Sequence, residues 1–254
     1  MFFSQFSTFD KIFFIAYNFK GGVFMNILIT AGGTKENIDA VRGITNYSTG
    51  QLGCLIAQKF LDNAANVTYI HGQNASLPTL SAKLTTIEIQ NTSQLQEKLL
   101  TNLQNNLYDC VIHAMAVSDY APYAISATDT IDANLTNLTP LQNFDGKISS
   151  DSPFVILALK QQPKIINCIK KIQPNTRLVG FKLLSNATQE ELLVAAYKQM
   201  KVSQSDYVLA NNLQDISGNK HKAILVNQNG IISAASTKQE IAEIIYNQLN
   251  EVKN

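Results

Sequence analysis

Apolar residues recur along the chain in two different rhythms. Short apolar runs predict buried strands at 26–30, 66–72, 84–89, 108–117, 154–160, 177–183 and 206–212, and a hairpin at 222–236. Apolar residues at helical spacing predict helices at 49–63, 91–107, 162–172, 188–203 and 237–252. Strands that alternate with helices are typical of parallel sheets, since parallel neighbours need a crossover connection. We therefore predict a Rossmann-like, doubly wound α/β fold: a mainly parallel sheet with helices on both faces.

Two segments depart from this pattern. Residues 120–153 are rich in Thr, Asn, Asp and Ser without sustained periodicity, which predicts an irregular flap that could include short antiparallel strands. Residues 1–24 are aromatic-rich and lack capping or turn signals. The peptide KGGVFM can be encoded by a purine-rich ribosome-binding sequence before an ATG, so we expect translation to start at Met25. Residues 1–24 would then be a mis-started or disordered leader, and residues 25–254 a single domain with a flap at about 120–153.

The net charge and the cysteine content limit which binding partners and which cellular compartment are expected. The net charge of +1 argues against a broad nucleic-acid-binding surface. The apolar N-terminal stretch is too short and too polar to span a bilayer, so no membrane partner is expected. The three cysteines are far apart and have no metal-binding spacing, which favours buried free thiols in a reducing cytoplasm. No metal site built from the chain's own residues is predicted.

A glycine-rich segment follows the first predicted strand. The chain there has small residues on both sides of a polar insertion: Gly32, Gly33, Ser48, Gly50 and Gly53. Free N–H groups at a helix start bind phosphate, which favours a nucleotide site here; glycines needed only for tight turns and packing are the alternative. Asp119 follows a predicted buried strand, and its side chain could bind a ligand or cap a helix. A single loop lysine such as Lys147 indicates no role by itself.

Several motifs together resemble a known family. The segments ITAGGTKENIDAVRGITNYSTGQLG, AVSDY, DGKISS, LKQQPKII, LVGFKL and DYVLANN occur in the order found in phosphopantothenate–cysteine ligases, also called phosphopantothenoylcysteine synthetases. The chain resembles the free-standing bacterial type from Met25 onward. The resemblance implies a ligase that joins 4′-phosphopantothenate and L-cysteine through an acyl-nucleotide intermediate in coenzyme A biosynthesis. It also implies CTP or ATP as the activating nucleotide, Mg²⁺ bound with the triphosphate, a cytoplasmic location and a homodimer.

The resemblance also implies roles for individual residues. Asn46 and Lys147 would be catalytic. The nucleotide-binding set would be Gly32, Ser48, Gly50, Gly53, Phe181, Asn211, Lys198 and Lys201, although the spacing leaves open which of the last two lysines meets the triphosphate. The substrate-binding set would be Arg42, Asn46, Met115, Ala116 and Asp119. The chain departs from the family's K-x-K-K segment after Lys147, because serines replace both later lysines.

Two other functions remain open from the sequence. A nicotinamide-dependent reductase would need G-x-G-x-x-G at the first turn and an acidic residue at the end of the second strand, but the chain has AGGTKE and His71-Gly72. A non-catalytic nucleotide-binding module would not need Asn46 in an insertion. Both alternatives are therefore weaker than the ligase.

Overall fold

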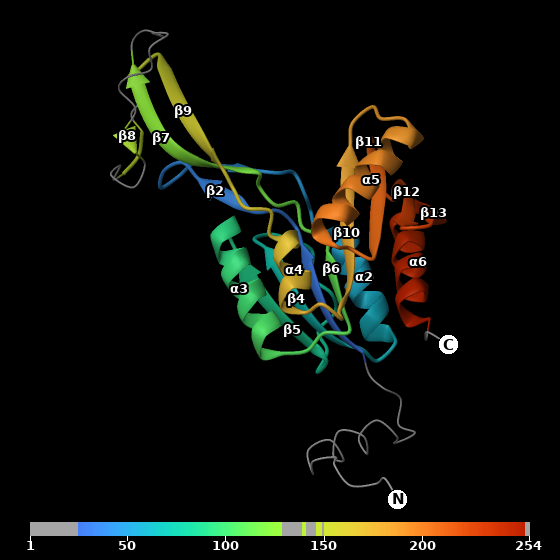
Figure 1. Cartoon of the computed structure of the whole chain (residues 1–254). Helices are drawn as coiled ribbons and strands as arrows, with labels where there is room; N and C mark the ends of the chain where they lie inside the picture. Colours follow the sequence, from blue (N-terminus) through green and yellow to red (C-terminus); the bar gives the residue numbers. More distant parts are fainter. Residues whose placement is uncertain (1–24, 129–138, 141–145, 149, 252–254) are drawn as a thin grey trace, which may run out of the picture.

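The computed structural model of the protein describes residues 25–128, 139–140, 146–148 and 150–251, so the predicted leader lies outside the described residues. An eight-stranded sheet forms the centre of the molecule (Figure 1). Its strands, in spatial order, are β13 (Gly230–Thr237), β12 (Lys220–Asn227), β11 (Tyr207–Ser217), β10 (Arg177–Leu184), β6 (Cys110–His113), β1 (Asn26–Ala31), β4 (Asn66–Gly72) and β5 (Leu84–Ile89).

Most neighbours in this sheet are parallel. β1 pairs with β4 and β6, β4 pairs with β5, and β10 pairs with β6 and β11, all in parallel register. Only the hairpin that β12 and β13 add beyond β11 is antiparallel in the described part of the sheet. The predicted mainly parallel α/β sheet is therefore confirmed.

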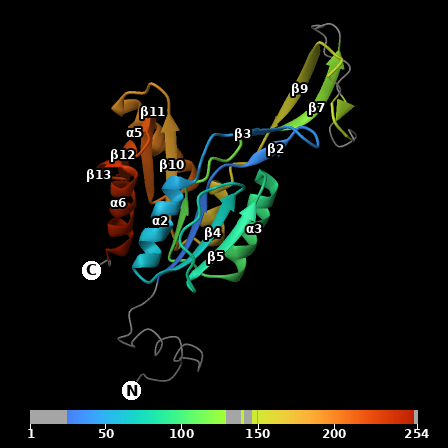
Figure 2. The same ribbon diagram turned by 180° about the vertical axis from the view of Figure 1, so that it is seen from behind.

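Helices cover both faces of the sheet (Figures 1 and 2). The helices are α2 (Gln51–Asp62), α3 (Thr92–Asn105), α4 (Ile166–Ile172), α5 (Gln189–Ser203) and α6 (Lys238–Asn250). Alternate residues of β1 show the two layers: Ile27 and Ile29 pack under α2 and α6, whereas Leu28 packs under α3 and α4. All three are fully buried. Burying such a side chain contributes about 1.5–3 kcal/mol, so both layers anchor the sheet.

A second, smaller sheet extends away from the main sheet as an arm (Figure 1). The arm consists of β7 (Tyr120–Thr128), β8 (Thr139–Pro140) and β9 (Phe154–Gln161), with β7 paired to both other strands in antiparallel register. The predicted flap allowed for short antiparallel strands, and residues 120–128 form one, which at 9 residues is longer than expected. These residues form a long strand because they pair with residues far along the chain, which local periodicity does not reveal. The predicted strand at 154–160 is confirmed, and it lies in the arm. Residues 129–138 and 141–145 of the predicted flap lie outside the described residues.

A short hairpin connects the sheet to the arm. It consists of β2 (Lys35–Asn37) and β3 (Gly43–Thr45), which the sequence pattern did not predict because each strand has only 3 residues. β2 also contacts β7. The hairpin carries the polar insertion that separates the two groups of glycines, so this insertion lies between the sheet and the arm.

Candidate functional site

The segment after β1 continues alongside the segment after β6. The backbone N–H of Ala116 donates to the carbonyl of Gly32 at 2.8 Å, and that of Thr34 donates to the carbonyl of Ala116 at 3.2 Å. A Cβ added at Gly33 would lie 2.7 Å from the carbonyl oxygen of Asn46, so glycine is needed for this approach. These contacts bring Asn46 next to the residues that follow β6.

A cleft of about 1020 Å³ opens at this place, on the side of the sheet covered by α4 and α5. It lies beyond the carboxyl ends of β6 and β10, where open α/β sheets bind their ligands. The cleft brings together six of the residues that the sequence predicted: Asn46, Met115, Ala116, Asp119, Phe181 and Lys198. They come from four separate segments of the chain, so the fold assembles this part of the predicted site.

The charges in the cleft are mainly positive. Lys164, Lys182 and Lys198 line it together with the carboxylate of Asp119. Lys164 forms an ion pair with Asp119, and both side chains are more than half exposed. The Nδ2 group of Asn46 donates to the carbonyl of Val117 at 3.1 Å, which directs its side chain toward the segment after β6. Cations around an open cleft suit an anionic ligand such as a triphosphate.

His113 also lines the cleft but supplies no positive charge near neutral pH. Burial lowers the pKa of His113 from 6.5 to about 4. Its Nδ1 lies 2.8 Å from Oγ1 of Thr30, which holds the ring in place. The cleft therefore depends on its lysines for charge.

Three of the side chains in the cleft were not predicted from the sequence. Lys164, Lys182 and His113 received no role, although the first two lie within the quoted motifs LKQQPKII and LVGFKL. The position of Lys164 just before α4 and that of Lys182 near the end of β10 could have indicated these two lysines, because strand ends and helix starts lie at the ligand-binding edge of such sheets.

The glycine turn, formed by Gly32, Ser48, Gly50 and Gly53, lies where the chain enters α2. Gly32 and Gly50 have φ angles of +82° and +70°, and each packs against Ala75. A Cβ added at Gly53 would lie 2.5 Å from Cβ of Ala31. Packing thus accounts for these three glycines, which is the alternative that the sequence left open. A nucleotide at this turn remains a prediction, and so does the role of the exposed Ser48.

Asn211 lies near the end of β11 and is buried. Its residue pair on β12, Ala223, belongs to the core under α2 and α6, so Asn211 is on that face of the sheet. Its Nδ2 group has no hydrogen-bond partner within the described residues. Buried donors without partners are rare and costly, which fits the predicted ligand contact.

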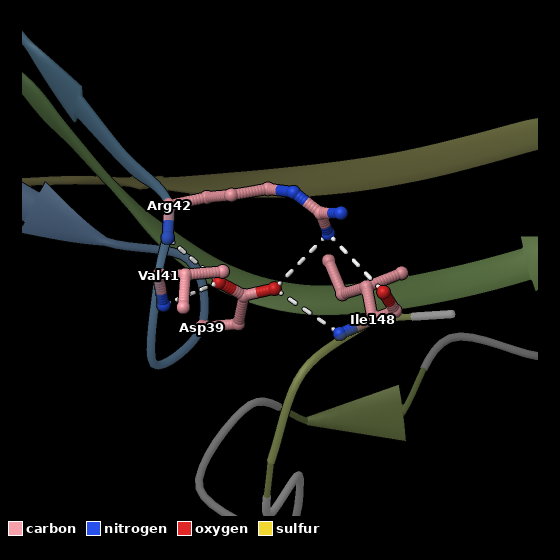
Figure 3. Close-up of polar contacts among 4 residues, drawn as sticks. All are labelled: Asp39, Val41, Arg42 and Ile148. Carbon is pink, nitrogen blue, oxygen red and sulfur yellow. Dashed lines mark hydrogen bonds and ion pairs between the residues drawn. The ribbon is translucent and has the colours of Figure 1, made fainter. Parts of the chain in front are cut away.

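Three predicted cations, like the glycine turn and Asn211, lie outside the cleft. Lys201 is exposed on α5 and does not line it. The Nη1 group of Arg42 donates to Oδ2 of Asp39 at 3.1 Å and to the carbonyl of Ile148 at 3.4 Å (Figure 3). Lys147, directly before Ile148, is exposed at the same place. The structure therefore places Arg42 and Lys147 beside each other at the base of the arm.

The described residues contain no group of three or more His, Cys, Asp or Glu side chains arranged to hold a metal ion. Nor does any helix in the described part of the chain have the length and apolar character to cross a bilayer.

Comparisons with known proteins agree on one family. Residues 24–252 match the family described as DNA/pantothenate metabolism flavoprotein C-terminal domain. The Coenzyme A biosynthesis bifunctional protein CoaBC of Thermococcus kodakarensis is 34% identical over 227 residues, a match that covers 89% of this chain and 51% of that protein. The chain thus spans about half the length of the curated relatives it matches.

Solved structures give the same result. The DNA/pantothenate metabolism flavoprotein from Streptococcus pneumoniae is 38% identical with a TM-score of 0.78, covering 89% of this chain and 98% of that chain. A mutant of Cab2 in complex with phosphopantothenate-cysteine has a TM-score of 0.67 at 18% identity, covering 94% of this chain and 88% of that chain, which shows a shared fold alone. The chain therefore belongs to the family of the DNA/pantothenate metabolism flavoprotein C-terminal domain.

Proposed function

We propose that the protein is a phosphopantothenate–cysteine ligase of coenzyme A biosynthesis. The observation that carries this proposal is the cleft, which gathers Asn46, Asp119 and three lysines beyond the carboxyl ends of β6 and β10. Its volume of about 1020 Å³ is large enough for a nucleotide beside a second substrate. The names of the bifunctional relatives also point to coenzyme A biosynthesis.

The proposed reaction has two steps. The carboxylate of 4′-phosphopantothenate attacks the α-phosphate of a nucleoside triphosphate, so that an acyl-nucleotide forms and pyrophosphate leaves. The amine of L-cysteine then attacks the acyl carbon, giving the amide and a nucleoside monophosphate, with one amine proton released to solvent. Both steps need positioned reactants and neutralised phosphate charge more than a covalent enzyme group.

The residues of the cleft suit these needs. Asn46 is proposed to donate a hydrogen bond to the substrate carboxylate, because its amide is exposed in the cleft beside Ala116. Lys182 and Lys198 are proposed to neutralise the negative charge of phosphate oxygens. The ion pair between Lys164 and Asp119 would open when a ligand binds, so that Asp119 can contact the ligand. Lys147 is proposed to approach the α-phosphate in the first step. Because Lys147 lies outside the cleft in this structure, this role requires the hairpin and the base of the arm, joined to each other, to move toward the cleft together.

The nucleotide and its metal ion are also proposals. CTP is the proposed substrate and ATP the competing one. Mg²⁺ is proposed to arrive with the triphosphate, because it prefers phosphate and water oxygens to dedicated protein cages.

The decisive experiment measures pyrophosphate release from CTP or ATP with and without 4′-phosphopantothenate. The ligase predicts release that depends on phosphopantothenate before cysteine is added, and nucleoside monophosphate only afterwards. Release without phosphopantothenate would contradict the proposal. A nicotinamide-dependent oxidation or reduction, or binding of nucleotide without turnover, would support one of the two alternatives.

We also propose that the protein is a cytoplasmic homodimer joined through the arm. Strands β7 and β9 of the arm expose large apolar side chains: Tyr120, Tyr123, Phe154, Val155 and Leu159, at 43–54% exposure. Exposed apolar surface on a projecting element suits a contact with a second subunit. Sedimentation at micromolar concentration should show a dimer, and the double substitution Tyr123→Ser with Phe154→Ser should shift it toward monomer. Leu80→Ser, at a residue that is 91% exposed outside the arm, is the control. A monomer with full activity would contradict the proposal.

A further inference from the structure

A buried carboxylate connects the hairpin to the base of the arm. The side chain of Asp39 lies in the turn between β2 and β3 and has 0% exposure. Its Oδ1 accepts from the backbone N–H groups of Val41 at 2.9 Å and Arg42 at 2.7 Å. Its Oδ2 accepts from Nη1 of Arg42 and from the backbone N–H of Ile148, both at 3.1 Å (Figure 3). Asp39 therefore joins two segments that are 109 residues apart.

The two oxygens of Asp39 have different tasks. Oδ1 stabilises the local turn, as Asp and Asn side chains commonly do. Oδ2 accepts from the arm and from the Arg42 guanidinium. An asparagine could accept the hydrogen bonds of the turn through its amide oxygen. Its amide nitrogen, however, is a donor and would face two other donors, Nη1 of Arg42 and the backbone N–H of Ile148. The second task thus requires a carboxylate at position 39.

Electrostatics agree with a permanently charged Asp39. Burial by itself raises the pKa of Asp39, but the N–H groups of Val41, Ile148 and Arg42 and the charge of Arg42 outweigh this effect and lower it. Hydrogen bonds to an ionised acceptor are roughly twice as strong as neutral ones. The bridge that Asp39 forms between the hairpin and Ile148 should therefore hold throughout the neutral pH range.

The hydrogen bonds of Asp39 to Ile148 and Arg42 act on two cations that were predicted from the sequence to take part in the reaction, Lys147 and Arg42. The side chain of Ile148 is buried, at 5% exposure, whereas the adjacent Lys147 is exposed. A fixed backbone at Ile148 limits where Lys147 can reach. Arg42 is held by both its backbone N–H and its Nη1, with 41% of its side chain exposed.

We propose that Asp39 is a positioning residue that holds Arg42 and Lys147 together as one cationic unit for the ligase reaction. This inference rests on the proposed function. Asp39 does not touch the reacting atoms; it acts through the backbone of Ile148 and the guanidinium of Arg42. Because Lys147 is proposed for the first step only, a displaced Lys147 should slow acyl-nucleotide formation and leave the cysteine step nearly unchanged.

The test combines Asp39→Asn with two measurements. Amide hydrogen exchange at Ile148 should become at least about 10-fold faster, since the loss of a charge-assisted hydrogen bond exposes this N–H. The rate of acyl-nucleotide formation should fall by about 10- to 100-fold, whereas cysteine attack on supplied acyl-nucleotide should change less than about 3-fold. Asp39→Ser, which keeps one acceptor for the turn, replaces the variant if Asp39→Asn does not fold.

Lys147→Gln is the matched control. It should slow acyl-nucleotide formation by about two to three decades and leave exchange at Ile148 unchanged. Adding Asp39→Asn to a protein that already carries both Lys147→Gln and Arg42→Gln should cause no more than about a 2-fold further loss, because residues that act through one another are not additive. A larger further loss would show that Asp39 acts independently of both cations and would overturn the inference.

Other outcomes separate this inference from the proposed function. Unchanged exchange at Ile148 in Asp39→Asn would refute the bridge. Faster exchange with a wild-type rate of acyl-nucleotide formation would refute positioning, while the ligase function would stand. If the wild-type protein forms no acyl-nucleotide, the proposed function fails and the positioning role fails with it.

Discussion

The cleft and the glycine turn lie at the same edge of one sheet but differ in what occupies them. The cleft is an open volume of about 1020 Å³ with three lysines along its wall. At the glycine turn, protein atoms already fill the space: Gly32 and Gly50 pack against Ala75, and Gly53 against Ala31. A glycine-rich strand-to-helix turn is therefore not enough to locate a ligand, because close packing and close ligand approach both require a missing side chain.

The Nδ2 group of Asn211, which has no hydrogen-bond partner among the described residues, is the main observation that favours a ligand on the side of the glycine turn. Asn46, Asp119 and Lys198 favour the cleft. Substitutions on each side can separate these two possibilities, since a residue used for packing changes stability, whereas a residue used for binding changes kinetics.

Asn46→Asp should have the largest effect. It replaces the amide donor in the cleft by a negative charge where the substrate carboxylate is proposed to lie, so we expect turnover to fall by about two decades or more. The melting temperature should stay close to that of the wild-type protein, because Asn46 is exposed. Asn37→Asp, an exposed change of the same kind on β2, is the control for added charge. Wild-type turnover in Asn46→Asp would remove Asn46 from the reaction.

His113 should make the wall of the cleft sensitive to acid. Its pKa is lowered from 6.5 to about 4 by burial, so the unfolded chain binds the proton first as the pH falls. The stability that the neutral ring contributes is complete above pH 6.5 and is lost as the pH falls toward 4, by about 3 kcal/mol in all. Urea unfolding at pH 7 and pH 4 should therefore show a smaller acid loss in His113→Gln. Equal acid losses in the two proteins would mean that His113 is accessible to protons in the folded state.

Gly53→Ala tests whether packing explains the glycine turn. The added Cβ would lie 2.5 Å from Cβ of Ala31, and overpacking of this kind typically costs about 1–3 kcal/mol. We expect urea unfolding to show this loss, with the KM for nucleotide unchanged. Adding Ala31→Gly should recover part of the stability, because it removes the other Cβ. A raised nucleotide KM without loss of stability would instead place the ligand at the glycine turn.

Substitutions of Lys198 and Lys201 should have the smallest effect, and these two lysines are the most closely matched pair of positions. Only the first of these two exposed lysines of α5 lines the cleft. Lys198→Gln should raise the KM for nucleotide about 10-fold, the effect of losing one charged contact to phosphate, and Lys201→Gln should change it less than about 2-fold. The reverse order would mean that the triphosphate lies outside the cleft.

The sequence alone determined the main sheet and several residues that the fold brings to one of its edges. The apolar runs 26–30 and 66–72 match β1 and β4, because central strands of a parallel sheet are buried on both faces and therefore rich in apolar residues. Residues at and just after the carboxyl ends of such strands meet at one edge of the sheet, which is why Ala116, Asp119 and Phe181 line one cleft.

Only the tertiary structure decided three other points. The arm depends on pairing between 120–128 and 154–161, and such long-range pairing leaves no local periodicity to read. Which of Lys198 and Lys201 lines the cleft depends on the rotation of α5 about its axis. The contact between Asp39 and Ile148 crosses 109 residues, so the need for a carboxylate at position 39 appears only when the chain is folded.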